Sequence, residues 1–287
     1  MRSSVLLARK YLSLSPVVPP RTWTSPGFLE RARTEYDDEC AGGFLKWFPS
    51  LQIRDKSVFD IGCGHGGRAV RFAELGARRV VGLEPFVDAG EEGRSFAAQQ
   101  GAGQVQFIAG TGEQIPLADD TFDLVTSYDV FEHVEDLGAV IGECRRILKP
   151  GGMLHAVFPP FYHPTGSHLD GWVSKMPWPN VLFRREALVE AVGEIMKQRN
   201  DGYAPHPMRS RDVLWTLNGA TIRSVRKLLE HSQFSQVDLR LSPLFSRMNG
   251  KWDSWRMKYY AFAFRPLRYV PKVNELFVHR IVLSATK

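Results

Sequence analysis

A strand, a glycine-rich turn and a helix within residues 57–75 constrain the fold more than any other stretch of this sequence. Residues 57–61 are rich in β-branched and aromatic side chains and predict a short buried strand. Glycines dominate residues 62–67, and residues 68–75 have apolar side chains at helical spacing. Glycines allow a backbone to take positive φ and to approach a ligand closely, and a helix start presents unpaired N–H groups. Such a unit is typical of a nucleotide-binding α/β fold.

A second predicted strand, residues 79–84, ends in an acidic side chain. Glu84 follows Asp60 by 24 positions. In dinucleotide-binding folds a carboxylate about 20 residues beyond the glycines accepts hydrogen bonds from ribose hydroxyls. The glycine turn carries no Lys-Ser/Thr pair of a phosphate-binding loop. This combination favours a nucleoside ligand without a pyrophosphate.

Four segments resemble the motifs of class I S-adenosylmethionine (SAM)-dependent methyltransferases. Residues 60–67 resemble motif I, and residues 82–85 resemble the second motif. Residues 110–125 are similar to the segment that lines the adenine, and residues 146–152 to the turn before the fifth strand. The resemblance, closest to type 11-like enzymes with small-molecule acceptors, implies SAM as cofactor and methyl transfer as activity. It also implies a Rossmann-like α/β fold, a seven-stranded sheet in the order 3-2-1-4-5-7-6 with helices on both faces and an inserted substrate-binding cap.

The pattern of elements divides the chain into four parts. The resemblance implies that residues 1–50 form an N-terminal tail and helix that cover the cofactor site, and that residues 51–158 form the SAM-binding core. Residues 159–220, rich in Pro, Trp and His, form a substrate-binding insertion, because so long a loop in a compact domain is usually functional. Residues 221–287 complete the core and contain an aromatic and basic insertion at residues 243–272.

Within these parts, apolar periodicity predicts individual elements. The predicted strands are residues 57–61, 79–84, 105–109, 122–128, 153–158, 236–241 and 277–284, and the predicted helices are residues 30–50, 67–75, 88–100, 137–148, 181–198 and 222–231. The ends of the first four strands then meet at one edge of the sheet, where ligands bind in open α/β folds.

The motif resemblance assigns the donor-binding residues. Asp60 and the glycine loop would face the amino-acid part of the donor, unless Asp60 only orders the turn. Glu84 would bind the ribose hydroxyls, and Tyr36 would either touch the donor or join the core. The complete donor-binding set is Asp60, Gly62, Cys63, Gly64, Glu84, Pro85, Thr111, Gly112, Glu113, Tyr128 and Asp129.

Methyl transfer needs an acid–base residue only where the acceptor must lose a proton. Histidine titrates nearest neutrality, so the catalytic candidates are His168, His133 and His163, each with a structural role as the alternative. We expect no metal, since a hard ion such as Mg²⁺ prefers oxygen ligands to His163, His168 and Asp170. Flat apolar walls for an acceptor, or the cap's own core, are offered by Phe161, Tyr162, Trp172, Trp178, Trp215, Trp252 and Trp255.

Composition bounds the partners. A net charge of +6 is too small an excess to indicate nucleic-acid binding, and no apolar run is long enough for a membrane span. Cys40, Cys63 and Cys144 are scattered and odd in number, which favours a reducing, cytoplasmic compartment over a disulfide framework. Residues 1–29 have four basic and no acidic side chains, which suits either a transit peptide or, as we favour, a packed tail.

The sequence therefore predicts an enzyme that methylates a small molecule, with an oxygen acceptor first and nitrogen or carbon next. A homodimer is compatible with this prediction. The alternatives are an RNA or protein methyltransferase, a non-catalytic SAM-binding regulatory subunit, and a dinucleotide-dependent oxidoreductase, which the four-motif match disfavours.

Overall fold

The computed structural model describes residues 2–15, 29–169, 173–198, 217–243, 270 and 273–287. The chain divides into two compact units. Unit 1 comprises Met1–Thr24, Pro159–Ile222 and Leu241–Arg280, and unit 2 comprises Ser25–Phe158, Arg223–Arg240 and Ile281–Lys287. Trp172, Trp215, Trp252, Trp255, Asp170 and nearly all of the predicted insertion at 243–272 lie outside the described residues.

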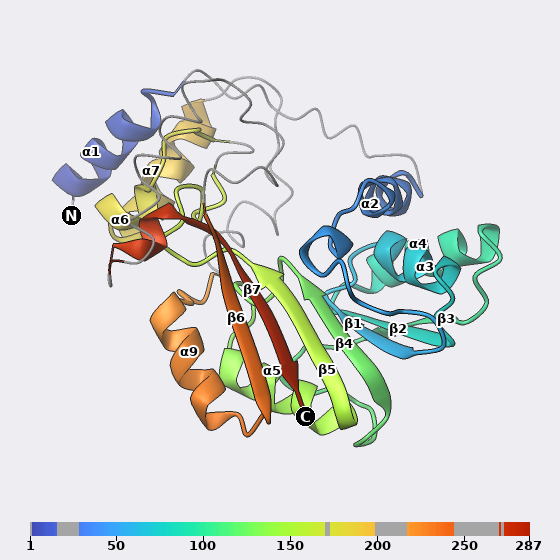
Figure 1. Ribbon diagram of the computed structural model, residues 1–287. Helices are drawn as coiled ribbons and strands as arrows, with labels where there is room; N and C mark the ends of the chain where they lie inside the picture. The colour runs from blue at the N-terminus through green and yellow to red at the C-terminus, as the bar shows by residue number, and fades with distance from the viewer. Residues whose placement is uncertain (1, 16–28, 170–172, 199–216, 244–269, 271–272) are drawn as a thin grey trace, which may run out of the picture. The chain divides into compact units, whose positions relative to one another are not determined.

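The described strands form one seven-stranded sheet in the predicted order, β3-β2-β1-β4-β5-β7-β6 (Figure 1). The strands β1 to β5 pair in parallel, and β7 runs antiparallel to β5. Parallel pairing brings the carboxyl ends of β1 to β4 to one edge, which is where such sheets bind ligands. Their bounds are β1 (Ser57–Ile61), β2 (Arg79–Glu84), β3 (Val105–Ala109), β4 (Phe122–Tyr128), β5 (Leu148–Phe158), β6 (Gln236–Pro243) and β7 (Val278–Thr286).

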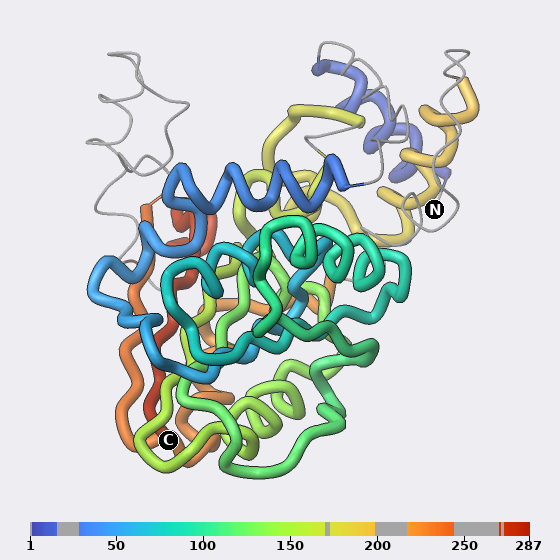
Figure 2. Tube along the Cα trace, turned by 90° about the vertical axis from the view of Figure 1, so that its right-hand side faces the viewer, coloured from blue at the N-terminus to red at the C-terminus, as the bar shows by residue number. Residues whose placement is uncertain are grey.

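The helices of unit 2 pack an apolar core onto the sheet. Strand β1 is buried along its whole length, because helices cover parallel sheets on both faces. A helix that precedes the sheet, α2, packs against α3 and α4, as Figure 2 shows. The described helices of this unit are α2 (Glu30–Cys40), α3 (Gly67–Glu74), α4 (Val87–Gln99), α5 (Leu137–Ile147) and α9 (Ile222–His231).

The single helix predicted at residues 30–50 is wrong in its second half. Helix α2 ends at Cys40, and a short 3-10 turn, Leu45–Trp47, follows. Gly42 takes a φ of 97°, in the left-handed region that ends helices. The buried carboxylate of Glu39 then accepts hydrogen bonds from the N–H groups of Phe44 and Leu45, which fixes the new direction of the chain.

The helices of unit 1 form a second apolar cluster. Helix α1 (Arg2–Leu12) packs on α7 (Arg185–Gln198) through small and aliphatic side chains. Two polar contacts support this packing: the Tyr11 hydroxyl donates to the Pro177 carbonyl at 2.6 Å, and Arg9 lies 3.3 Å from Glu194. The cluster contains Val5, Ala8, Leu12, Leu169, Val173, Ala187, Leu188, Ala191 and Val192. The first 50 residues are therefore divided between the units, with α1 in unit 1 and α2 in unit 2.

The helix predicted at residues 181–198 is interrupted. A short helix, α6 (Pro179–Leu182), precedes α7, and Phe183 between them is extended, with φ −129° and ψ 148°. Residues 158–172 contain no regular helix where the structure describes them, as their prolines and glycines predict.

Candidate functional site

The glycine loop after β1 comes very close to the chain that follows β4. Gly62 and Gly64 take φ values of 64° and 56°. A Cβ atom on Gly62 would collide with the side chain of Val130, and one on Gly64 would lie 2.5 Å from a Glu35 oxygen. Only glycine satisfies both the conformation and the space at these positions.

Glu84, at the end of β2, turns its side chain onto this loop. One carboxylate oxygen accepts a hydrogen bond from the Gly64 N–H at 3.1 Å. Burial raises the pKa of Glu84, while the N–H groups of Gly64 and Phe86 act in the opposite direction. The exposed side chains of Phe86 (55%) and Val87 (57%) follow directly. A carboxylate and an apolar surface thus stand side by side at the edge of the sheet.

Asp60 does not reach this edge with its side chain. It is fully buried, and both of its oxygens lie 3.1 Å from Nε of Arg68. The Thr126 hydroxyl donates to it at 2.8 Å, and a second Arg68 nitrogen donates to the Gly62 carbonyl at 3.2 Å. Burial raises the pKa of Asp60, and the Arg68 guanidinium opposes that effect. These contacts hold the glycine turn in place; contact of Asp60 with a donor stays a prediction.

Cys63 also faces inward. Its side chain is buried against Gly82, and burial raises the pKa of the thiol. Its N–H donates to the Leu83 carbonyl, and its carbonyl accepts from Gly66. The structure therefore shows Cys63 as a buried support of the loop, while its neighbours Gly62 and Gly64 are half-buried.

Helix α2 covers the glycine loop through a residue that the sequence did not single out. The Glu35 carboxylate accepts hydrogen bonds from the N–H groups of His65 (3.0 Å) and Gly67 (3.1 Å), and lies 2.9 Å from Nδ1 of His65. In return, Glu92 of α4 accepts from the Ala32 N–H of α2 at 3.1 Å. A carboxylate at the first N–H groups of α3 is favourable because these groups carry partial positive charge.

Tyr36, on the same helix, has a structural environment. Its hydroxyl donates to Glu74, with oxygen distances of 2.7 and 2.9 Å, and its ring lies edge-on to Phe96. The hydrogen bond to Glu74 raises the pKa of Tyr36 to about 12. Tyr36 was predicted either to touch the donor or to join the core, and the contacts described here are packing contacts.

The loop after β3 contains the predicted Thr111, Gly112 and Glu113. Gly112 is buried against Val140, and Thr111 is exposed. The Glu113 carboxylate accepts from the Glu135 N–H at 2.8 Å, just before α5 begins. Glu113 thus ties the loop to the start of α5.

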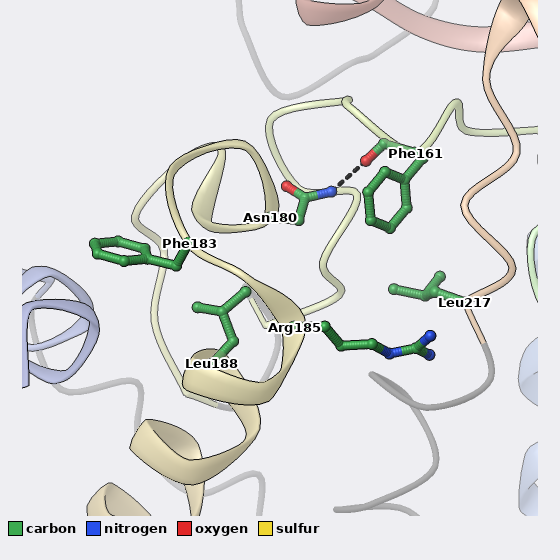
Figure 3. A pocket seen from close by; sticks show the side chains of 6 residues that line it. All are labelled: Phe161, Asn180, Phe183, Arg185, Leu188 and Leu217. Carbon is green, nitrogen blue, oxygen red and sulfur yellow. Dashed lines mark hydrogen bonds between the residues drawn. The ribbon is translucent and has the colours of Figure 1, made fainter. Parts of the chain in front are cut away.

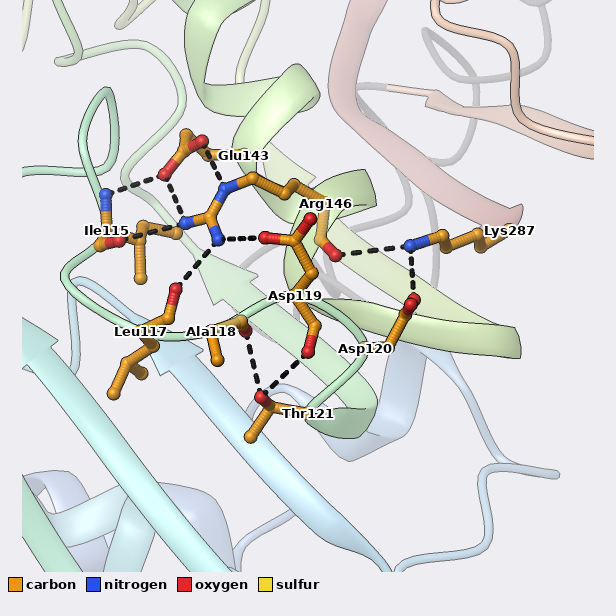
Figure 4. Close-up of polar contacts among 9 residues, drawn as sticks. All are labelled: Ile115, Leu117, Ala118, Asp119, Asp120, Thr121, Glu143, Arg146 and Lys287. Atoms are coloured by element: carbon orange, nitrogen blue, oxygen red, sulfur yellow. Dashed lines mark hydrogen bonds and ion pairs between the residues drawn. The ribbon is translucent and has the colours of Figure 1, made fainter.

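Arg146 ties the same loop to the end of α5 (Figure 4). Its guanidinium donates to the carbonyls of Leu117 (2.7 Å) and Ile115 (2.9 Å) and to the carboxylate of Asp119 (2.7 Å). It also pairs with Glu143, whose other contact is the Ile115 N–H at 2.8 Å. The Arg146 hydrogen bond lowers the pKa of Glu143. This residue belongs to the segment 146–152 that resembles a family motif, and the structure shows that it holds the loop opposite.

The remaining predicted donor residues lie at strand ends. Tyr128 closes β4, with its ring 6.1 Å from that of Phe44 and 5.9 Å from the Arg68 guanidinium. Asp129 takes a φ of 58° and donates its N–H to Val157 at 2.9 Å. Pro85 is exposed after Glu84. The ends of β2 and β4 and the glycine loop are thus gathered in unit 2.

The three candidate histidines do not share one unit. His133 belongs to unit 2 and lies 3.9 Å from the buried Glu132, whereas His163 and His168 belong to unit 1. His163 is 4% exposed; its Nδ1 accepts from the Thr165 N–H at 3.2 Å, and its Nε2 lies 3.1 Å from Nδ1 of His279. Since a backbone N–H can only donate, neutral His163 carries its proton on Nε2 and donates it to His279. Both of its nitrogens are engaged, which disfavours it as a base.

His168 is placed differently. It takes a φ of 56°, and burial, with the charge of Arg280, lowers its pKa to about 4. Burial also lowers the pKa of His163 well below the usual value. A neutral imidazole at physiological pH is the form that can accept a proton.

The core of unit 2 matches a known protein family. The family model described as a methyltransferase domain matches residues 59–156. This segment is a class I SAM-dependent methyltransferase domain. It contains the glycine loop, Glu84 and Arg146, so the motif resemblance is confirmed.

Curated relatives support the same family. The chain is 32% identical over 119 residues to YcgJ of Bacillus subtilis, an uncharacterized methyltransferase, over 42% of this chain and 46% of YcgJ. It is 36% identical over 97 residues to the ubiquinone biosynthesis O-methyltransferase of a Bradyrhizobium strain, over 34% of this chain and 37% of that protein. This chain spans less than half the length of either relative.

Solved structures match a larger share of the chain and confirm the fold. The crystal structure of YcgJ has a TM-score of 0.51 at 16% identity and covers 89% of this chain and 98% of its own. Phosphoethanolamine N-methyltransferase 2 of Haemonchus contortus, in complex with SAM, has a TM-score of 0.57 at 14% identity and covers 98% of this chain and 60% of its own.

In the described part of the chain, no helix has the length and apolarity needed to cross a membrane.

Proposed function

We propose that this protein binds SAM at the carboxyl edge of β1 to β4 and transfers its methyl group to a small-molecule acceptor, with a hydroxyl oxygen as the first expected acceptor atom. The observation that carries the proposal is the position of Glu84 against the glycine loop, 3.1 Å from the Gly64 N–H. A carboxylate at the end of β2 accepts hydrogen bonds from ribose hydroxyls in related folds.

The residues present suit a nucleoside donor. Glycine at positions 62 and 64 lets the loop pack directly against Val130 and Glu35, which fixes the loop's backbone beside Glu84. Phe86 and Val87 offer an exposed apolar surface beside Glu84, on which a flat base can pack. Backbone groups of the loop at Thr111, held by Glu113 and Arg146, would then meet the edge of the adenine.

Methyl transfer from SAM is an in-line displacement at a carbon already activated by the sulfonium. The protein's task is to align the acceptor with that carbon and to exclude water. A hydroxyl acceptor must also lose its proton. We keep His168 and His133 as candidates for that step, since both nitrogens of His163 are engaged within unit 1.

Relatives point to more than one acceptor chemistry. Names among them include ubiquinone biosynthesis O-methyltransferase and sterol 24-C-methyltransferase, so nitrogen or carbon methylation remains the second candidate. A non-catalytic SAM-binding subunit is the alternative from another functional class. A homodimer and a cytoplasmic location stay predictions from the sequence.

Calorimetric titration with S-adenosylhomocysteine tests the proposal. We expect micromolar binding by the intact chain and about 30-fold weaker binding by Glu84→Ala, since a hydrogen bond to a charged group contributes about 2 kcal/mol. The matched control is Glu91→Ala, which removes an exposed carboxylate from α4 and should bind normally. Absence of binding by the intact chain would contradict the proposal. Transfer of labelled methyl groups to acceptors then separates an enzyme from a non-catalytic subunit.

A further inference from the structure

Helix α1 carries apolar side chains on both of its faces. Val5, Ala8 and Leu12 are buried on the side of α7, beside which α1 lies in Figure 1. The opposite face is open to solvent: Leu7 is 59% exposed, and Leu14, just after the helix ends, is 71% exposed. These two leucines are seven positions apart, so helical periodicity places them on one stripe. A surface helix ordinarily has polar side chains on its outer face, so an apolar outer stripe is unusual.

The exposed stripe continues onto α6. Tyr11, about one turn from each of the two leucines, packs its ring on that of Phe183, with the ring centroids 5.6 Å apart. Figure 3 shows the Phe183 side chain pointing toward α1, the blue helix. The two residues before it, Val181 (42%) and Leu182 (56%), are exposed. These side chains form one surface, which we call the apolar surface of unit 1: Leu7, Leu14, Val181 and Leu182.

Exposed apolar side chains are concentrated in this unit. Seven of the ten exposed large hydrophobic side chains among the described residues belong to unit 1, although unit 2 has more described residues. Single exposed apolar residues are normal on a protein, whereas clustered ones mark an interaction site. The clustering in unit 1 therefore indicates a binding surface.

Cations border the apolar surface. Lys10 lies one turn before Leu14 on α1, and Arg184 directly follows the α6 residues and Phe183. Lys175 lies at the end of α1, where its N–H donates to the Ser15 hydroxyl at 3.0 Å. All three cationic side chains are exposed, and in the described part of the chain none pairs with a carboxylate. Helix α1 contains no acidic residue.

This mixture of leucine and cations fits an anionic membrane surface better than a protein partner. Protein interfaces are depleted of lysine, whereas helices that lie on a membrane combine Leu with Lys and Arg. A second copy of the same surface would bring cations against cations. A nucleic-acid backbone would pair with the cations but leave the leucines in water.

Carboxylates of α7 do not cancel this charge. Glu186 and Glu190 are exposed on α7. Helical periodicity places them on the opposite side of α7 from its buried residues Leu188 and Val192, which belong to the apolar cluster shared with α1. The two glutamates therefore project away from α1.

We propose that the apolar surface of unit 1 binds the surface of a membrane that contains anionic lipids. The apolar side chains enter the boundary between head groups and acyl chains, and Lys10, Lys175 and Arg184 contact the anionic head groups. Helix α1 lies on the membrane and does not cross it, because its 11 residues are fewer than the about 20 that a span needs. The inference goes beyond the proposed function, since it rests on unit 1 alone and requires neither SAM nor an acceptor.

Co-sedimentation of the full chain with lipid vesicles tests the proposal. One set of vesicles contains phosphatidylcholine alone, and the other contains phosphatidylcholine with about 30% phosphatidylserine. We expect at least about tenfold tighter binding to the anionic vesicles, because three cations face the lipid. Binding should weaken as salt is raised, since salt screens exposed charges.

Paired variants separate the apolar from the electrostatic contribution. Leu7→Ser with Leu14→Ser should weaken binding to the anionic vesicles at least about tenfold, because two exposed leucines no longer enter the lipid. Lys10→Gln with Arg184→Gln should weaken it about tenfold and reduce its dependence on salt. The matched controls are exposed residues of unit 2, Val237→Ser and Arg226→Gln, which should bind as the intact chain does.

Thermal unfolding shows whether each variant is folded, and Leu182→Ser on α6 gives an independent variant where the α1 change disturbs folding. Absence of binding to the anionic vesicles would overturn the proposal. Binding that Leu7→Ser with Leu14→Ser and Leu182→Ser leave unchanged would also overturn it, because the attraction would then be purely electrostatic. Light scattering that shows a dimer of the intact chain and a monomer of the leucine variant would assign the surface to a second copy instead.

Discussion

The glycine loop of unit 2 and the surroundings of Asn180 in unit 1 differ in how the chain satisfies their polar groups. At the loop, carboxylates of the chain already accept from backbone donors: Glu84 from Gly64, and Glu35 from His65 and Gly67. In unit 1, the amide oxygen of Asn180 is shielded from solvent and has no hydrogen-bond partner among the described residues. The protein's own hydrogen bonds thus fix the shape of the loop, and a bound methyl donor would replace these contacts or add to them. Asn180 shows the opposite case, a buried acceptor that the described part of the chain leaves without a partner.

The largest expected effect tests how far the loop depends on its buried support. Arg68→Met leaves Asp60 fully buried without its cation, and breaking such a pair by removing one partner costs about 3–5 kcal/mol of unfolding free energy. Denaturant titration measures it. The double variant Asp60→Asn with Arg68→Met should recover part of the loss, because no uncompensated charge remains. Equal losses for the single and double variants would show that an uncompensated charge on Asp60 is not the cause of the loss.

The second largest effect on stability should come from acidic pH, which acts on His168 in unit 1. The pKa of His168 is lowered to about 4, while the unfolded chain keeps the ordinary value of 6.5. As the pH falls from about 6.5 to about 4, His168 binds a proton in the unfolded state but not in the folded state. The free energy of unfolding therefore decreases over this pH range, by at most about 3 kcal/mol. His168→Asn, which tolerates the positive φ, should reduce the difference in unfolding free energy between pH 7.5 and pH 5. An unchanged difference would show that His168 is not the source of the acid sensitivity.

The comparison also shows what a sequence can predict. Strands β1 to β5 and helices α3 to α5 are found nearly where periodicity and the glycine loop place them, because each element has its own local signal. Glu84 is found for the same reason, since its position is counted along the chain from the glycines. Glu35 is missed, because its contact with the loop depends on how α2 packs on α3, and no spacing within the sequence encodes that packing.

The break in the helix at Phe183 could not be predicted for a similar reason. The sequence predicts one helix over residues 181–198, whereas the structure divides this region into α6 and α7 at the extended Phe183. Arg68 could be predicted only in part. Its place on α3 is evident from the sequence, and its inward orientation toward Asp60 is evident only in the structure.

A smaller effect is expected from the clamp on the loop after β3. Arg146→Gln removes hydrogen bonds to Ile115, Leu117 and Asp119 and should cost about 1–3 kcal/mol of unfolding free energy. If the loop also binds the exocyclic amine of the adenine, the variant should lose part of the preference for S-adenosylhomocysteine over S-inosylhomocysteine, which lacks this amine. Arg145→Gln, which removes one exposed contact to the Gln233 carbonyl, is the control. A destabilised variant with full preference would leave Arg146 with a purely structural role.

The smallest effect should come from the contact between α2 and the glycine loop. Glu35→Gln keeps one oxygen that can accept from the His65 or Gly67 N–H but removes the negative charge at the start of α3. The expected loss is about 0.5–1 kcal/mol, because a charge at a helix end contributes about that much. Denaturant titration measures it, and Asp37→Asn, an exposed change on the same helix, is the control. Binding of S-adenosylhomocysteine should change less than threefold, because Glu35 contacts the backbone of the loop, whereas Glu84 is the residue proposed to bind the ligand. If Glu35→Gln instead weakened binding as strongly as Glu84→Ala, α2 would have to be counted as part of the donor site.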